Sequence, residues 1–289
     1  MKDILDLIEQ KKNKFAKLPF FEYLRDTSIH PRQRLVWSHC LAYFAMFFGE
    51  LNNDFLRIEP AKNQLQKLIN NHAIEDEQHW LWFLEDLEKL NFDPQIKFTD
   101  TLKFLWSKET KQTRDLSYEI MSLCNMYNDQ VLRLAIIETL EATGNVTLSI
   151  TTDVCRELEK ENPGEYRYFG KHHVDFETGH LIGPDNVHHQ IESIEITENQ
   201  KQQAFLIVEK LFAAFHACTY EWMMYAQNHL LTETINSPHL PKTDVQFLGK
   251  EQQILNFVVH NKPKVEIIDV WQQSGRTKTC LEETLVTKE

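Results

Sequence analysis

Glycine and proline are scarce in this chain, with 8 and 9 copies among 289 residues. These residues most often interrupt helices and shape tight turns, so their scarcity leaves room for long helices and argues against an all-β fold. Hydrophobic residues make up 42% of the chain, which is enough to bury a large core. We therefore expect an all-α protein with about seven or eight helices.

Apolar residues recur at helical spacing along most of the first 230 positions. The segments with this pattern are 2–18, a stretch from Pro31 through the aromatic run that ends near 55, then 60–90, 98–108, 112–126, 129–158, 165–182 and 197–230. The sequence ENPG at 161–164 predicts a turn. After Pro238 and Pro241 the pattern becomes partly alternating. We expect a helical domain over 1–239 and a C-terminal arm over 240–289, with a short strand or partial disorder.

Charge and cysteine content limit the partners of the chain. The formal net charge of -12 argues against nucleic acid or an anionic membrane surface as the main partner. The longest apolar run, Leu41–Phe48, is too short to cross a bilayer, and the first residues lack a signal-peptide pattern. The five scattered cysteines fit reduced thiols. We expect a cytoplasmic protein with no membrane partner.

In the predicted helix 60–90, ionisable residues interrupt the apolar face. His72, then Glu75 or Asp76, then His79 occupy positions where core side chains are expected, because residues three and four apart share one side of a helix. A locally solvated face or a helix-stabilising charge cluster would explain the same pattern. These residues become candidate ligands only if other helices supply further ones.

The predicted helix 129–158 places Glu138 directly after the apolar residues Ala135, Ile136 and Ile137. Glu141 follows one turn later and competes with it for the same role. A lone acid in a helix is more often exposed than ligating. The interpretation of Glu138 as a metal ligand therefore depends on its apolar neighbours.

The predicted helix 165–182 carries the clearest pattern. His173, Glu177 and His180 follow an H-x3-E-x2-H spacing that places all three on one face. Phe169 and Phe176 share that face, which argues against solvated charge. Three such side chains can therefore point to one centre.

Taken together, three carboxylates and three imidazoles are the donors that a pair of iron or manganese ions prefers. Burying them without a metal or mutual pairing would cost on the order of several kcal/mol for each charged group. The candidate ligands are Glu75, His79, Glu138, His173, Glu177 and His180, with Asp76, His72 and Glu141 as alternates.

This arrangement resembles the haem-oxygenase-like dimetal oxidases and oxygenases, the CADD- and UndA-like proteins, whose fold is related to TenA. Their pattern has an acid and a histidine on one helix, a glutamate on a second, and H-x3-[DE]-x2-H on a third. The third element matches at His173, Glu177 and His180, and the segments HWLWFLEDL from His79 and LAIIE ending at Glu138 look like the other two. The resemblance covers about 30–230.

The resemblance implies a haem-oxygenase-like helical bundle with two Fe2+ ions, of which the second can be labile, and Mn as the alternative metal. It also implies that O2 and a small organic metabolite are the substrates, through oxidation, hydroxylation or bond cleavage, and that the chain can form a homodimer. In the family, the first acid often lies further from its histidine than Glu75 lies from His79. This departure leaves Glu75, Asp76 and His72 open as the first ligand.

Three other interpretations use the same residues differently. A ferritin-like dimetal bundle would pair Asp76 with His79 and Glu177 with His180, would add Glu50 and Glu138, and would leave His173 unused. A metal-free, TenA-like hydrolase would need a cysteine nucleophile, for which Cys218 is the nominee. A non-catalytic helical binding protein would use the polar residues only to pair with one another.

Overall fold

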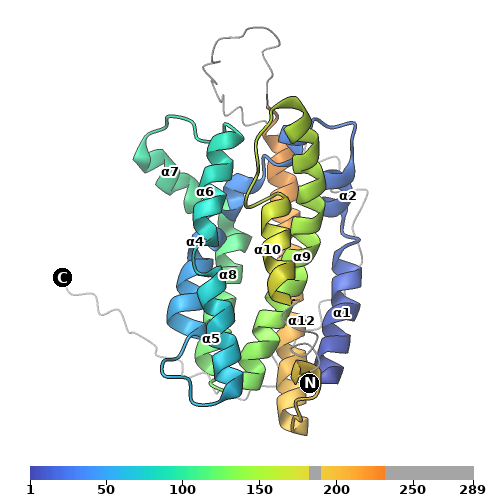
Figure 1. Cartoon of the computed structure of the whole chain (residues 1–289). Helices are drawn as coiled ribbons and strands as arrows, with labels where there is room; N and C mark the ends of the chain where they lie inside the picture. Colours follow the sequence, from blue (N-terminus) through green and yellow to red (C-terminus); the bar gives the residue numbers. More distant parts are fainter. Residues whose placement is uncertain (182–189, 232–289) are drawn as a thin grey trace, which may run out of the picture. The chain divides into compact units, whose positions relative to one another are not determined.

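The two longest helices, α9 (Gln130–Glu161) and α12 (Glu198–Asn228), lie side by side at the centre of the bundle (Figure 1). The carboxylate of Asp129 accepts hydrogen bonds from the first backbone N–H groups of α9. Thr197 and Gln200 form a reciprocal capping box at the start of α12. Both long helices therefore begin at well-defined residues.

The structure is a computed structural model that describes residues 1–181 and 190–231, and of 177–181 only the backbone. Nine further α-helices of the described residues complete the bundle, together with the π-helix η1 and the 3-10 helix η2. They are α1 (Lys2–Phe15), α2 (Pro19–Arg25), α3 (Pro31–Arg34), α4 (Ser38–Glu50), η1 (Leu51–Leu56), α5 (Gln64–Asp76), α6 (His79–Lys89), α7 (Phe98–Leu105), η2 (Lys108–Thr110), α8 (Lys111–Met126) and α10 (Lys171–Leu181).

Packing between helices gives α9 a central role. Helix α1 packs against both α9 and α12, and α8 packs against α12 and α4. Helices α5 and α10 both contact α9. Helices α5 and α10, which are distant in sequence, therefore both lie against α9 (Figure 1).

Aromatic side chains fill the core between α2, α4 and α12. The rings of Trp37 and Trp222 are stacked, with centroids 4.9 Å apart and an angle of 27° between their planes. The ring of Phe20 meets both of them edge-on, at 5.1 and 5.6 Å. All three side chains are buried, and burial of such a side chain contributes about 1.5–3 kcal/mol.

The prediction of an all-α fold is confirmed, since the described residues form helices and loops and contain no strand. The number of helices was predicted too low, because eleven α-helices lie in the described part of the chain. The stretch that follows Pro31 is divided into α3, α4 and η1, and the predicted helix 60–90 is divided into α5 and α6. Pro19, where we expected a helix to end, is also the first residue of α2.

The division of the predicted helix 60–90 lies at Glu77 and Gln78, where α4 makes a close approach. A Cβ atom at Gly49 of α4 would lie 2.8 Å from the carbonyl oxygen of Glu77 and 3.1 Å from the Trp80 ring. Only glycine fits this contact without displacing its neighbours. The sequence offers no glycine or proline inside 61–93 to mark the division, so packing rather than local propensity explains it.

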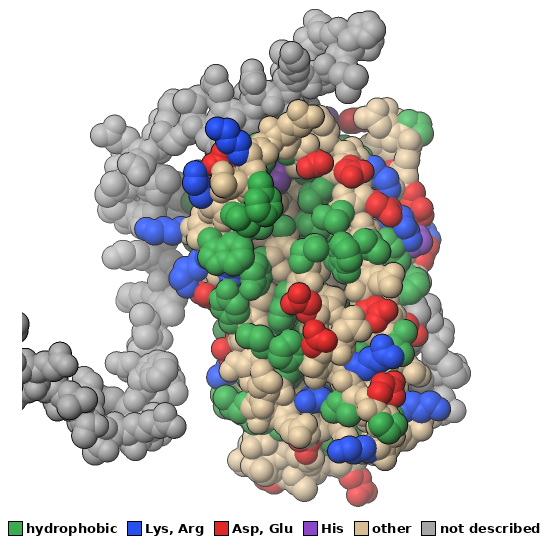
Figure 2. Space-filling model, turned by 90° about the vertical axis from the view of Figure 1, so that its left-hand side faces the viewer, with side chains coloured by type: hydrophobic (Ala, Val, Ile, Leu, Met, Phe, Trp, Pro, Cys, Tyr) green, Lys and Arg blue, Asp and Glu red, His purple; other side chains and the backbone are tan. Residues whose placement is uncertain are grey.

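The predicted arm over 240–289 lies outside the described residues. Within the described ranges, no helix combines the length and the apolar character that a membrane crossing requires. Helix α7 has no buried residue. Apolar side chains gather on the face shown in Figure 2. Phe98 and Trp106, at the two ends of α7, are among the exposed large hydrophobic residues.

Candidate metal centre

The division between α5 and α6 places Asp76 and His79 at two adjoining helix ends. Helix α5 ends at Asp76, α6 begins at His79, and Gln78 between them has a non-helical backbone (φ -114°, ψ 7°). The Nδ1 atom of His79 lies 3.8 Å from Oδ1 of Asp76. Both side chains are buried, with residue exposures of 7% for Asp76 and 3% for His79.

A first group of donors surrounds Asp76 on the side of α9. The Nε2 atom of His72 lies 3.1 Å from Oδ2 of Asp76 and 3.5 Å from Oε1 of Glu141. One donor atom from each of these three residues lies within 4.8 Å of the other two, which is close enough for all three to bind one ion. His72 and Glu141 are half-buried, so this group is partly accessible to solvent.

A second group joins α6 to α10. The Nε2 atom of His173 lies 3.1 Å from Nδ1 of His79, and both side chains are buried. Two nitrogen ligands that are each about 2.1 Å from one ion, at roughly a right angle, would be about 3 Å apart. This spacing fits two imidazoles on a single metal ion.

The other ring nitrogen of His173 fixes its tautomer. Its Nδ1 atom lies 2.9 Å from the carbonyl oxygen of Tyr168. A carbonyl oxygen can only accept, so the neutral ring carries its proton on Nδ1 and has a lone pair on Nε2. A metal-binding histidine almost always donates its second N–H to such an acceptor. His173 therefore presents a donor atom in the direction of His79.

A buried carboxylate shapes the turn before α10. Asp86 is fully buried and accepts hydrogen bonds from the backbone N–H groups of Arg167 (2.9 Å), Tyr168 (2.8 Å) and Phe169 (2.9 Å). Burial raises the pKa of Asp86, and these three hydrogen bonds partly offset that effect. The predicted helix 165–182 starts only at Lys171, and the N–H groups of 167–169 in the turn before it donate to Asp86.

Aromatic rings enclose the second group. The ring of Trp82 stacks on His79, with centroids 4.4 Å apart and an angle of 22° between the planes. Phe176 meets His79 edge-on at 5.4 Å, and Tyr168 lies 5.0 Å from His173. The guanidinium of Arg167 lies 4.9 Å from the Trp82 ring. These rings limit the access of water to the two imidazoles.

Among the predicted site residues, the structure brings His79 and His173 together, and it adds the three alternates Asp76, His72 and Glu141. Glu75 is half-buried on α5, and Glu138 is half-buried on α9, one turn before Glu141 and on the same face. Glu177 and His180 lie on α10, one and two turns after His173, and their side chains are outside the described ones. Asp86 is not among the predicted site residues, since its only signal in the sequence is its place as an acid in the apolar stretch WFLEDL.

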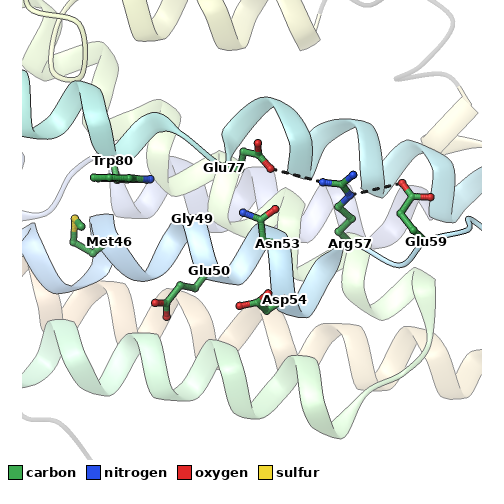
Figure 3. A pocket seen from close by; sticks show the side chains of 9 residues that line it. All are labelled: Met46, Gly49, Glu50, Asn53, Asp54, Arg57, Glu59, Glu77 and Trp80. Carbon is green, nitrogen blue, oxygen red and sulfur yellow. Dashed lines mark ion pairs between the residues drawn. The ribbon is translucent and has the colours of Figure 1, made fainter.

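A pocket of about 700 Å³ adjoins the α5–α6 division (Figure 3). Its lining residues are Met46, Gly49, Glu50, Asn53, Asp54, Arg57, Glu59, Glu77 and Trp80. Arg57 lies between Glu59, at 3.7 Å, and Glu77, at 3.8 Å. Glu77 and Trp80 neighbour Asp76 and His79 in sequence, so the pocket and the donor groups share the same helix ends. The ion pair of Arg57 with Glu77 joins the residue that follows η1 to the connection between α5 and α6.

Two of the rival interpretations meet difficulties in the geometry. The ferritin-like alternative uses Glu50 as a ligand, but Glu50 is exposed and lines the pocket. The same alternative leaves His173 without a role, although His173 contacts His79. Cys218, the nucleophile of the hydrolase alternative, is fully buried, and burial raises the pKa of its thiol well above the usual range. A buried thiol of this kind is inert rather than nucleophilic.

No protein-family model and no curated protein matches the sequence. Among solved structures, the chain is similar to a TenA homolog from Pseudomonas syringae pv. tomato str. DC3000, with 12% identity and a TM-score of 0.49 over 77% of this chain and 91% of that one. The similarity concerns the TenA side of the predicted relationship and not a dimetal oxidase. At this level it carries no argument about activity.

Proposed function

We propose that this protein is an O2-activating, non-haem dimetal oxidase or oxygenase that acts on a small organic metabolite. The observation that supports the proposal is the position of Asp76 between two donor groups. It lies 3.1 Å from His72, which is near Glu141, and 3.8 Å from His79, which contacts His173. A carboxylate between two sets of donors could contribute an oxygen ligand to either set.

The donor types favour iron or manganese. Carboxylate oxygens and imidazole nitrogens together suit these ions. None of the four described cysteines, which are free and buried, belongs to the group of His72, Asp76 and Glu141. Bound ferrous ions would supply the electrons with which O2 is reduced. The family resemblance noted from H-x3-E-x2-H on α10 supports the same class.

The chain's own residues would hold the centre and control its surroundings. Asp76 would offset positive charge of bound metal, and His173, whose Nδ1 faces the Tyr168 carbonyl oxygen, would bind metal through Nε2. The rings of Trp82 and Phe176 keep bulk water from the imidazoles, which limits stray oxidation. Substrate and O2 would approach from the half-buried side, where His72 and Glu141 lie.

The two halves of the centre would differ in how tightly they hold metal. His79 and His173 are 3% and 4% exposed, whereas the side chains of His72 and Glu141 are 24% and 18% exposed. Water competes for an ion more effectively at the more exposed half. We therefore assign the labile second ion to His72, Asp76 and Glu141.

The experiment that tests this activity measures O2 uptake. The full chain is loaded anaerobically with Fe2+ and mixed with O2 while uptake and the visible spectrum are recorded. We expect rapid uptake with a transient absorption change, and none from protein loaded with redox-inactive Zn2+. Iron-loaded protein that consumes no more O2 than the zinc-loaded control would overturn the oxidase assignment.

A metal-free, TenA-like hydrolase is the second candidate. Its test is C218S, because replacement of a nucleophilic thiol abolishes hydrolysis but leaves metal binding unchanged. The buried position of Cys218 predicts that C218S has no effect on any activity of the protein. The homodimer and the choice between iron and manganese remain predictions.

A further inference from the structure

We infer that Asp86 is a positioning residue that sets the tautomer and direction of His173, although it touches neither donor group. The effect of Asp86 on metal binding rests on the proposed metal centre. The contacts from Asp86 to His173 do not depend on that proposal. Two contacts connect Asp86 to His173, one from Asp86 to the turn 167–169 and one from Tyr168 to His173. A third contact joins His173 to His79.

The first contact fixes the turn. One oxygen of Asp86 accepts the N–H of Arg167, and the other accepts the N–H groups of Tyr168 and Phe169. Three successive N–H groups directed at one carboxylate constrain the backbone of the whole turn. A neutral amide at position 86 would present a donor where at least one of these N–H groups needs an acceptor.

The second contact, between the Tyr168 carbonyl oxygen and His173, orients the imidazole ring. Tyr168 donates its N–H to Asp86 at 2.8 Å, and its carbonyl oxygen accepts from His173 Nδ1 at 2.9 Å. Fixing the peptide groups on both sides of Tyr168 fixes the direction of that carbonyl. Without it, the proton of the neutral imidazole can move to Nε2, the atom that faces His79.

The same turn has attachments besides Asp86, and one of them, Lys89, also contacts Asp86, with its Nζ atom 3.8 Å from Oδ1. The Nζ atom of Lys89 donates to the carbonyl oxygen of Glu165 at 2.7 Å, and Arg167 pairs with Glu85 at 3.2 Å. Loss of the Asp86 carboxylate should therefore alter the turn without releasing it. This separates a positioning role from simple attachment of the loop.

The test is D86N in the full chain, with two readouts. Nitrogen NMR of the metal-free protein reports the His173 tautomer, and anaerobic titration with Co2+ reports the affinity of each metal site. We expect the Nδ1–H tautomer in the wild type and a mixture in D86N. We also expect Co2+ affinity to fall about 10- to 100-fold at one site, as for other outer contacts of ligand histidines, with the second site unchanged.

E221Q is the matched control. Glu221 is also a buried carboxylate that accepts backbone N–H groups, those of Gln112 and Thr113, but it caps α8, which carries none of the donor residues. E221Q should leave the His173 tautomer and both Co2+ affinities unchanged. If D86N fails to fold, D86E takes its place, since it keeps the carboxylate but moves it by one methylene.

The outcomes separate this inference from the proposed function. A wild type that binds no Co2+ or Fe2+ contradicts the metal centre, while the tautomer still tests Asp86. A wild type that binds metal, with a D86N variant that has the wild-type tautomer and unchanged affinities, overturns the positioning role. Equal weakening of both sites in D86N also overturns it, because that result indicates a general structural effect.

Discussion

The Nε2 atom of His173 lies 3.1 Å from Nδ1 of His79, although the two residues are 94 positions apart. The contact depends on two local irregularities, the division between α5 and α6 and the turn before α10 that Asp86 holds. Both interrupt segments that would otherwise continue as regular helices. Asp76 and His79 therefore lie at interrupted helix ends, whereas His72 and Glu141 lie within α5 and α9.

Replacement of a single histidine in either donor group should remove the ion of that group only. After anaerobic loading with Fe2+, we expect H173A and H72A each to hold one ion per chain, because each loses a donor of a different group. H216A, at an exposed position of α12, is the control and should bind as the wild type does. Metal analysis of the gel-filtered proteins measures this. If both variants keep the wild-type amount, these histidines are not ligands.

The two ions should differ in their rate of loss. Brief exposure of the loaded protein to a chelator should remove first the ion near His72 and Glu141, whose side chains are the more exposed ones. H173A, which keeps only that ion, should lose it quickly, and H72A should lose its remaining ion slowly. Stopped-flow mixing with a coloured chelator follows both rates. Equal rates in the two variants would contradict the assignment of the labile site.

Two glycine-to-alanine substitutions should have opposite effects on stability. G49A places a Cβ atom 2.8 Å from the Glu77 carbonyl, and such overpacking costs about 1–3 kcal/mol, more than alanine gains in helix propensity. G144A lies in α9, where a Cβ atom meets nothing within 4 Å, and should stabilise by about 0.5–1 kcal/mol. Urea unfolding of the metal-free proteins measures both. A G49A variant as stable as the wild type would show that α4 can move away from the connection between α5 and α6 at no cost in stability.

The acid dependence of stability should show the burial of Glu221. Burial raises the pKa of its carboxyl above the ordinary value, an effect that hydrogen bonds from Gln112 and Thr113 reduce. Between the ordinary and the raised pKa, the native state keeps a proton that the unfolded chain has released. The free energy of unfolding of the wild type, relative to E221Q, should therefore fall as pH rises through that window and level off above it. Urea unfolding at a series of pH values measures the difference, and a rise in the same window would contradict the raised pKa.

Part of this organisation could be predicted from the sequence. Periodicity predicted the helical character of α8, α9 and α12, and ENPG predicted the turn after α9, because these features depend on local spacing and turn chemistry. The division at Glu77 could not be predicted, since it is linked to the close approach of Gly49 from another helix.

The candidate metal centre, too, could be predicted from the sequence only in part. Spacing singled out His79 and His173, because both interrupt apolar faces. It could not choose among Glu75, Asp76 and His72, since a continuous helix was assumed where α5 ends and α6 begins. Asp86 was missed because its partners are backbone N–H groups more than 80 residues away, which no side-chain pattern reveals.

The most direct test of the dimetal centre is the iron content of the full chain after anaerobic reconstitution with Fe2+ and removal of unbound metal. We expect two ions per chain in the wild type and a loss of both in D76A, because Asp76 lies between the two donor groups. A single ion in the wild type would contradict the dimetal assignment. No bound iron would contradict the metal centre altogether.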